Sequence, residues 1–297
     1  MTNGDFPIKE TDKTRAPADR ILIGMALMAL AMFVIPVRDG IAKHMTDALP
    51  VFTIAWGTYC AAAIIAAPIA FCVHGRDAIL PAGLASQTAR TLLLVGAMTM
   101  FFFSIQTVPL ANAIAANFVA PFIAAVLAPF VLNERFTWAV AGAVTFGFFG
   151  VIVVLQPNGD FDANILWAVG AGFLFAFYML ATRLAAQQAP ALATLCYQSV
   201  LGAIVLTPFA LGAGIQGMGA FLGFFATIGL LQSVSHGLSI TAFRLAPASI
   251  LAPLVYLEIV AAVVVGLVAF EDWPATKTWI GIAIIIIAGC LVALRRN

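Results

Sequence analysis

The polar side chains that could do chemistry in this sequence stand inside long apolar stretches. Glu258 lies near the middle of one stretch, and His236 lies in another with Gln232 one helical turn before it. Gln232, His236 and Ser239 share one face of a helix, because residues three and four apart are neighbours on a helix surface. Polar and ionisable groups inside a membrane helix usually face the interior of the bundle. We therefore expect these residues to line a central site.

Each of these groups has two interpretations. Glu258 either relays a proton or pairs with an ammonium group of a substrate, or it is a protonated acid that is hydrogen-bonded to a neighbouring helix. The stripe of Gln232 and His236 either lines a water-filled cavity or holds two helices together. We favour the cavity, because three polar residues on one face exceed what a single packing contact needs.

Three further polar residues are candidates on other stretches. Arg38 and Asp39 close the first apolar stretch, roughly 27 Å from Arg20 along a helix, so we expect them at the outer mouth of the bundle. There they either steer a charged or zwitterionic solute or form a solvated ion pair. Asn117 has no polar neighbour one turn away. It either hydrogen-bonds across the bundle or contributes to the site.

The sequence predicts no metal site, no cofactor and no nucleic-acid partner. It contains neither the GxxxxGK[ST] phosphate loop nor the HExxH zinc motif. The formal net charge of +1 gives no basic field for nucleic acid. Single cysteines inside apolar stretches are typical of packing residues rather than metal ligands; they are Cys60, Cys72, Cys196 and Cys290.

Composition places these residues in a membrane protein. Hydrophobic residues make up 63% of the chain and charged residues 9%, against roughly 25% charged in ordinary soluble domains. Segments of about 20 apolar residues, divided by charged, Pro or Gly positions, predict an all-α integral membrane protein of ten transmembrane helices. The predicted spans are Ile21–Ile41, Val51–Val73, Thr91–Thr107, Leu110–Leu132, Trp138–Leu155, Ile165–Leu184, Ala191–Leu211, Phe221–Thr241, Ala248–Phe270 and Trp279–Leu294.

Loop charges predict the orientation. With a cytoplasmic N-terminus, eleven of the 14 Lys and Arg residues fall on the inner side and three on the outer side, as the positive-inside rule requires. We expect both termini in the cytoplasm. Residues 1–20 read as a polar cytoplasmic tail rather than a cleavable signal, because no short apolar core with a small-residue cleavage site follows.

The two halves of the chain repeat the same pattern. Ser104 precedes the tetrapeptide 110–113, LANA, at the spacing at which Ser239 precedes the tetrapeptide 245–248, LAPA. We expect two repeats, 21–156 and 163–294, of five helices each. Since five is odd, the second repeat enters the membrane from the opposite side, and such inverted repeats around a central cavity are typical of transporters. The alternative is a duplication that produced only a stable bundle.

Three segments carry a resemblance to a known family. They are GMALMALAMFVIPVRDGIAKHM, VPLANAIAANFVAPFIAAVLAPFVLNERFTW and FRLAPASILAPLVYLEIVAAVVVGLVAFEDWP. From about Arg20 to Arg296 the chain resembles the EamA family of the drug/metabolite transporter superfamily, whose best understood bacterial members export aromatic amino acids. The resemblance implies a multi-pass protein of the bacterial inner (plasma) membrane, with a cavity between the first, third, fourth, sixth, eighth and ninth helices. Glu258-Ile259 stands where the family commonly has Glu-Pro, which removes a proline hinge.

The resemblance adds aromatic candidates on those helices. The predicted substrate-binding residues are Phe33, Phe101, Asn117, Tyr178, Gln232, His236, Tyr256 and Glu258, with Arg38 and Asp39 at the outer mouth. We expect a secondary transporter that exports an aromatic or hydrophobic amino acid by alternating access, with proton coupling as an option. The first alternative is an importer of a vitamin or nucleoside-like metabolite, and the second is a membrane-embedded enzyme.

Small residues on the fifth helix leave the oligomeric state open. Ala139, Ala143 and Gly147 recur every four positions, a pattern typical of closely packed membrane helices. They either dock this helix within one protomer or join two protomers, so the protein is a monomer or a homodimer. Its other partner is the lipid bilayer.

Overall fold

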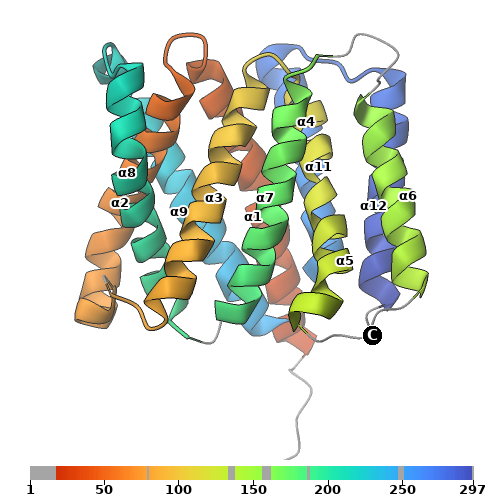
Figure 1. Ribbon diagram of the computed structural model, residues 1–297, viewed down its shortest axis with the longest axis horizontal. Helices are drawn as coiled ribbons and strands as arrows, with labels where there is room; N and C mark the ends of the chain where they lie inside the picture. The colour runs from red at the N-terminus through yellow and green to blue at the C-terminus, as the bar shows by residue number, and fades with distance from the viewer. Residues whose placement is uncertain are drawn as a thin grey trace, which may run out of the picture.

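The structure, a computed structural model, describes residues 18–78, 80–132, 138–155, 162–185, 188–246 and 251–295. Every regular element within these residues is a helix (Figure 1). The helices are α1 (Ala18–Met45), α2 (Val51–His74), η1 (Gly75–Ala78), α3 (Leu84–Ile105), α4 (Leu110–Asn117), α5 (Val119–Leu132), α6 (Trp138–Leu155), α7 (Ile165–Ala185), α8 (Ala191–Ala213), η2 (Met218–Phe221), α9 (Leu222–Leu245), η3 (Ala252–Tyr256), α11 (Leu257–Phe270) and α12 (Thr276–Arg295).

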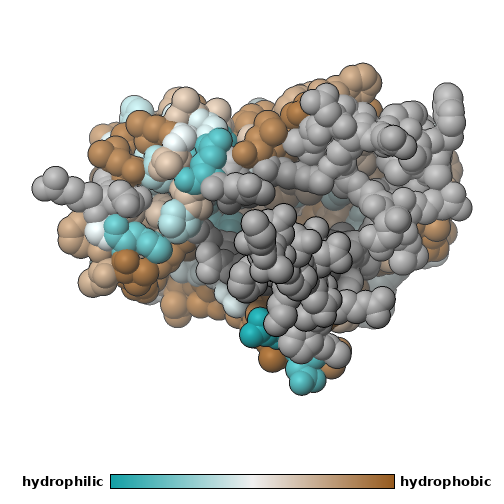
Figure 2. Space-filling model, turned by 90° about the horizontal axis from the view of Figure 1, so that it is seen from below, coloured by the Kyte–Doolittle hydropathy of each residue, from teal (hydrophilic) through white to brown (hydrophobic). Residues whose placement is uncertain are grey.

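Length and hydropathy make this a multi-pass membrane protein. Seven helical segments of the described chain are long and apolar enough to cross a bilayer. They are Asp19–Met45, Val51–His74, Leu84–Ile105, Leu110–Leu127, Ile165–Thr182, Leu192–Ala213 and Met218–Ser239, and shorter apolar helices cover Thr145–Val154, Leu254–Phe270 and Thr276–Ala288. Large apolar side chains such as Ile64, Phe130 and Val268 point outward with more than 70% of their surface exposed. Hydrophobic residues also recur around the outline in Figure 2, so the outer surface suits lipid.

The helices stand side by side in one bundle. The most extensive contacts join α1 to α9, α3 to α7, α2 to α8 and α6 to α12. The pair α6 and α12 lies at one edge of the bundle, whereas α1, α3, α7 and α9 lie nearer its centre (Figure 1). The described chain begins and ends on the same side of the bundle (Figure 1).

Two of the predicted spans are interrupted. The stretch 110–132 is not one helix, because α4 ends at Asn117 and α5 begins at Val119. Pro121 explains the break: it has no N–H to donate to the carbonyl of Asn117 four residues earlier. The ninth span likewise enters as the short 3₁₀ helix η3, with a proline in its first turn, before α11.

The structure corrects several predicted helix ends, of which two concern α1 and α3. The first helix continues to Met45, past the expected end at Ile41, and α3 begins at Leu84 rather than Thr91. The start at Thr91 was placed directly after Arg90, on the assumption that this charge lies outside the span. That assumption is wrong for Arg90, which is 5% exposed inside the bundle.

Lys43 connects three segments at one end of the bundle. Its Nζ donates to the carbonyl of Val108 at 2.8 Å and lies 3.3 Å from Oδ2 of Asp272. The same ammonium group lies 5.1 Å from the ring centre of Phe270. These contacts tie the end of α1 to the segments that follow α3 and α11.

Some expected features lie outside the described residues. They are most of the N-terminal tail, residues 247–248 of the second repeated tetrapeptide, and the side chains of Ala139 and Ala143. Gly147 is described, and it packs against a helix of the same chain. A Cβ at this position would lie 2.2 Å from the ring of Phe122 on α5.

Gly229 provides a test of the packing between α2 and α9. A Cβ at Gly229 would lie 2.7 Å from the backbone carbon of Ala61, whereas a Cβ at Gly237, two turns along the same helix, meets nothing within 4 Å. We expect Gly229→Ala to lower the free energy of unfolding by about 1–3 kcal/mol, because backbone cannot yield as a side chain can. Unfolding of purified protein in mixed detergent micelles measures the loss. Gly237→Ala is the control and should match wild type; equal stability of the two variants would contradict the packing.

Candidate functional site

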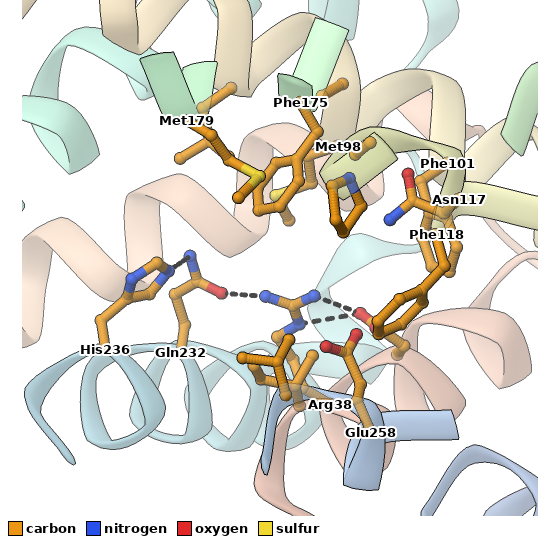
Figure 3. Close-up of a pocket in the computed structure, with 17 residues that line it drawn as sticks. Arg38, Met98, Phe101, Asn117, Phe118, Phe175, Met179, Gln232, His236 and Glu258 are labelled. Carbon is orange, nitrogen blue, oxygen red and sulfur yellow. Dashed lines mark hydrogen bonds and ion pairs between the residues drawn. The ribbon is translucent and has the colours of Figure 1, made fainter. Parts of the chain in front are cut away.

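A cavity of about 170 Å³ lies at the centre of the bundle. It has room for several water molecules, and so for a small solute. Its walls come from α1, α3, α4, α5, α7, α9, η3 and α11. The polar residues in its lining are Arg38, Asp39, Asn117, Gln232, His236 and Glu258 (Figure 3).

Arg38 organises a chain of hydrogen bonds along one wall (Figure 3). Its Nε donates to Oδ1 of Asp39 at 2.8 Å, its Nη2 lies 2.5 Å from the same oxygen, and its Nη1 donates to Oε1 of Gln232. The amide nitrogen of Gln232 lies 3.1 Å from Nε2 of His236. Asp39 and Gln232 are almost completely buried. The guanidinium is thus held between α1 and α9.

This chain of bonds also decides the form of His236. Because the Gln232 oxygen accepts from Arg38, the Gln232 nitrogen is the atom that faces the imidazole, and an amide nitrogen can only donate. Nε2 of His236 must therefore accept, which places the ring proton on Nδ1 of a neutral imidazole. In this arrangement His236 is an acceptor and not a third cation beside Arg38.

Glu258 completes the polar wall from the first turn of α11. Its carboxyl interacts electrostatically with Asp39 and Arg38, and no described side chain hydrogen-bonds to it. With both carboxyls ionised, this group of three residues carries one negative charge more than positive. The wall therefore has capacity for a cationic group or a proton beside Glu258.

The opposite wall is aromatic and apolar. Figure 3 shows Met98, Phe175 and Met179 across the cavity from the polar chain, and Phe101 and Phe118 also line the cavity. Aromatic rings and polarizable thioethers pack well against a flat ring system. The cavity thus offers one polar face and one face suited to an aromatic or hydrophobic group.

The structure brings together seven of the ten residues that the sequence singled out. Those in the cavity lining are Arg38, Asp39, Phe101, Asn117, Gln232, His236 and Glu258. Arg38 and Asp39 do not form a solvated pair at the mouth, because their helix continues for six residues beyond Asp39 and both side chains turn inward.

Three predicted residues do not line the cavity. Phe33 is 44% exposed on α1. The ring of Tyr178 lies 5.2 Å from that of Phe175 and packs behind it, and the ring of Tyr256 lies 5.1 Å from that of Phe118. The sequence identified the correct helices, but the face that each residue occupies depends on the rotation of the helix. Tyr178 and Tyr256 therefore support the aromatic wall from outside.

Sequence reasoning missed several lining residues. On α3 the lining residues are Leu94, Ala97, Met98 and Phe101, at the three- and four-residue spacing of one helix face. Phe101 was a candidate, so this spacing alone could have added the other three. Phe175 and Met179 have the same relation on α7. Phe118 is different, because its place depends on the break between α4 and α5.

A helical membrane bundle with a central cavity of mixed polarity is the architecture of a solute carrier. The chain matches the EamA-like transporter family over residues 22–156 and 163–294, and it belongs to this family. A solved crystal structure that is 18% identical shares the fold, with a TM-score of 0.62 over 94% of this chain and 99% of the other.

Curated relatives carry more specific names. A protein of Rickettsia felis named S-adenosylmethionine uptake transporter is 26% identical over 266 residues, which is 89% of this chain and 90% of the relative. A protein of Rhizobium johnstonii named riboflavin transporter is 29% identical over 208 residues, which is 68% of each chain. These names support the alternative of an importer for a vitamin or nucleoside-like metabolite better than amino acid export.

The buried pair of Arg38 and Asp39 yields a prediction about stability. We expect Asp39→Asn to lower the free energy of unfolding by about 2 kcal/mol, less than the usual loss for a broken buried pair because Arg38 keeps its bond to Gln232. The double variant R38Q/D39N, which removes both charges, should recover most of this loss. Unfolding in mixed micelles measures both variants, and a double variant no more stable than D39N would contradict the pairing.

Proposed function

We propose that this protein is a secondary transporter that takes up a small metabolite with a flat aromatic ring system and a polar or charged portion, of the nucleoside or vitamin kind. The observation that carries the proposal is the two-faced cavity. The wall of Arg38, Gln232 and Glu258 suits the polar portion, and the wall of Phe101 and Phe175 suits the ring (Figure 3).

The names of the relatives support the same class of solute. S-adenosylmethionine and riboflavin each join a flat nitrogen-containing ring system to a flexible polar part. The charges of the cavity fit such a molecule, because the excess negative charge of Arg38, Asp39 and Glu258 can face a cationic centre. The direction of transport in this proposal is uptake, in line with the name of the Rickettsia relative.

The proposed transport mechanism is alternating access between two inverted repeats. We place the repeats at 21–156 and 163–294, with ten spans in all, both termini in the cytoplasm and the bacterial inner membrane as the location. Support comes from the two separate stretches that match the family and from the interrupted helices, one in each stretch, which reach the same cavity. Interrupted helices at a central site are typical of such carriers.

Counterflow in proteoliposomes tests the proposed solute class. Vesicles loaded with one unlabelled solute at a time, from a panel of S-adenosylmethionine, riboflavin, adenosine, phenylalanine and tryptophan, would be diluted into a labelled trace of the same solute. We expect transient accumulation of at least one of the first three, because a carrier exchanges solute faster than it returns empty. Accumulation of only the two amino acids would overturn the solute class. Accumulation of none would overturn the transport role.

Glu258 provides a test of proton coupling. We expect Glu258→Gln to reduce uptake driven by an inwardly directed proton gradient by more than tenfold while the purified amount of protein is unchanged, because the amide cannot take up a proton in the cavity. Glu271→Gln is the matched control, since Glu271 lies exposed at the other end of the same helix. Wild-type uptake with an unchanged response to the gradient in E258Q would refute the coupling role.

A further inference from the structure

A second arginine lies inside the bundle, outside the cavity already described. Arg90 is one helical turn before Leu94, a residue of the cavity lining, on the side of the cavity where α3 begins. It is 5% exposed. Unlike Arg38, it forms no ion pair with a carboxylate of the described residues.

The partners of Arg90 are neutral. Its Nη1 donates to Oε1 of Gln87 at 3.2 Å, and its Nη2 donates to Oε1 of Gln198 on α8 at 2.5 Å. The ring of Tyr178 lies 5.4 Å from the guanidinium carbon. Nε is buried and has no hydrogen-bond partner among the residues that the structure describes. Across the described part of the chain, no carboxylate forms an ion pair with Arg90.

In this arrangement the guanidinium of Arg90 has neither a counter-ion nor acceptors for all of its N–H groups among the described residues. A buried cation without a counter-ion is costly, because amide oxygens replace only part of the lost hydration. A guanidinium has five N–H donors, and the two glutamines accept two of them. In a guanidinium, Nε–H and one hydrogen of Nη2 lie on the edge that binds both oxygens of a carboxylate, and on Arg90 the Nε–H of this edge has no acceptor among the described residues.

Contacts connect this arginine to the central cavity. Tyr178, which covers the guanidinium, is stacked on the cavity residue Phe175. Tyr178 and Phe175 thus lie between Arg90 and the interior of the cavity.

We propose that Arg90 is a second binding site for the transported solute, which takes a carboxylate group as the solute moves from the cavity towards the end of the bundle where α3 begins. The site rests on the proposed function. A carboxylate matches the single positive charge, whereas a phosphate monoester would bring an excess negative charge into the bundle. Since the guanidinium is covered in the present conformation, the solute reaches it when the helices around Tyr178 and Gln198 move apart.

Acetate is a probe that tests the site without transport. Purified protein would be unfolded thermally while sodium acetate replaces sodium chloride at constant ionic strength. We expect the midpoint of wild type and of Arg38→Gln to rise by about 2 °C or more, because a bound ligand stabilises the folded state. Arg90→Gln should show no rise, and Arg90→Lys less than half of it, because an ammonium group cannot bind both oxygens side by side.

Three outcomes would overturn the site. They are no acetate effect in wild type, an effect that persists in Arg90→Gln, and an effect that is lost in Arg38→Gln instead. If Arg90→Gln does not fold, Arg90→Lys carries the test, and a wild-type response in that variant also overturns the site. Because acetate binding requires no flux, a negative result here beside positive counterflow rejects the Arg90 site alone. Absent counterflow beside an Arg90-dependent acetate effect rejects only the transport role.

A pair of solutes gives the second readout. S-adenosylmethionine carries a carboxylate and adenosine does not. We therefore expect Arg90→Gln to raise the concentration of S-adenosylmethionine that half-inhibits counterflow of the labelled solute more than tenfold, and the corresponding concentration of adenosine less than twofold. Equal loss for both solutes would indicate that Arg90 only holds α3 against α8, and would overturn the carboxylate site.

Discussion

The bond between Arg38 and Asp39 is the interaction on which the cavity depends. Both side chains come from one turn of α1 inside an apolar bundle, where an unpaired charge is expensive. Asp39 fixes the guanidinium, the guanidinium fixes the amide of Gln232, and the amide fixes the neutral form of His236. A single ion pair thus sets the direction of the donors of Arg38, Gln232 and His236. Glu258 lies beside this chain of hydrogen bonds, and no described side chain hydrogen-bonds to its carboxyl.

Breaks in the helices bring the two walls together. Because Pro121 has no N–H, the carbonyl of Asn117 lacks its usual helical donor where α4 meets α5. Gly172 lets α7 approach this point: a Cβ there would lie 2.6 Å from the Asn117 oxygen. On the other side of the cavity, η3 gives way to α11 just before Glu258. An interrupted helix can change its angle at lower cost than a continuous one, so both breaks are suited to repacking around a solute.

The sequence predicted the helices of the site better than their faces. Glu258 and His236 were correctly expected in the interior, because an ionisable group in lipid has no other stable place. Phe33, Tyr178 and Tyr256 were misplaced for a physical reason: lipid and the bundle interior are equally apolar, so hydrophobic periodicity does not reveal which face of a membrane helix is buried. Arg90 and Arg38 were assigned to helix ends because charge was taken as the mark of a loop. Only the three-dimensional contacts with Gln198 and Gln232 show how a span accommodates them.

The two arginines differ in a way that bears on how a carrier could work. Arg38 is neutralised by the protein itself, so the cavity is stable when empty. Arg90 has only amide partners among the described side chains, so the conformation that uncovers it gains most from an anionic group brought by the solute. A ligand shifts a conformational equilibrium only by its differential affinity for the two states. The charge of Arg90, which lies beyond the neutralised Arg38, supplies such a difference. It favours the conformational change of the loaded carrier over that of the empty carrier.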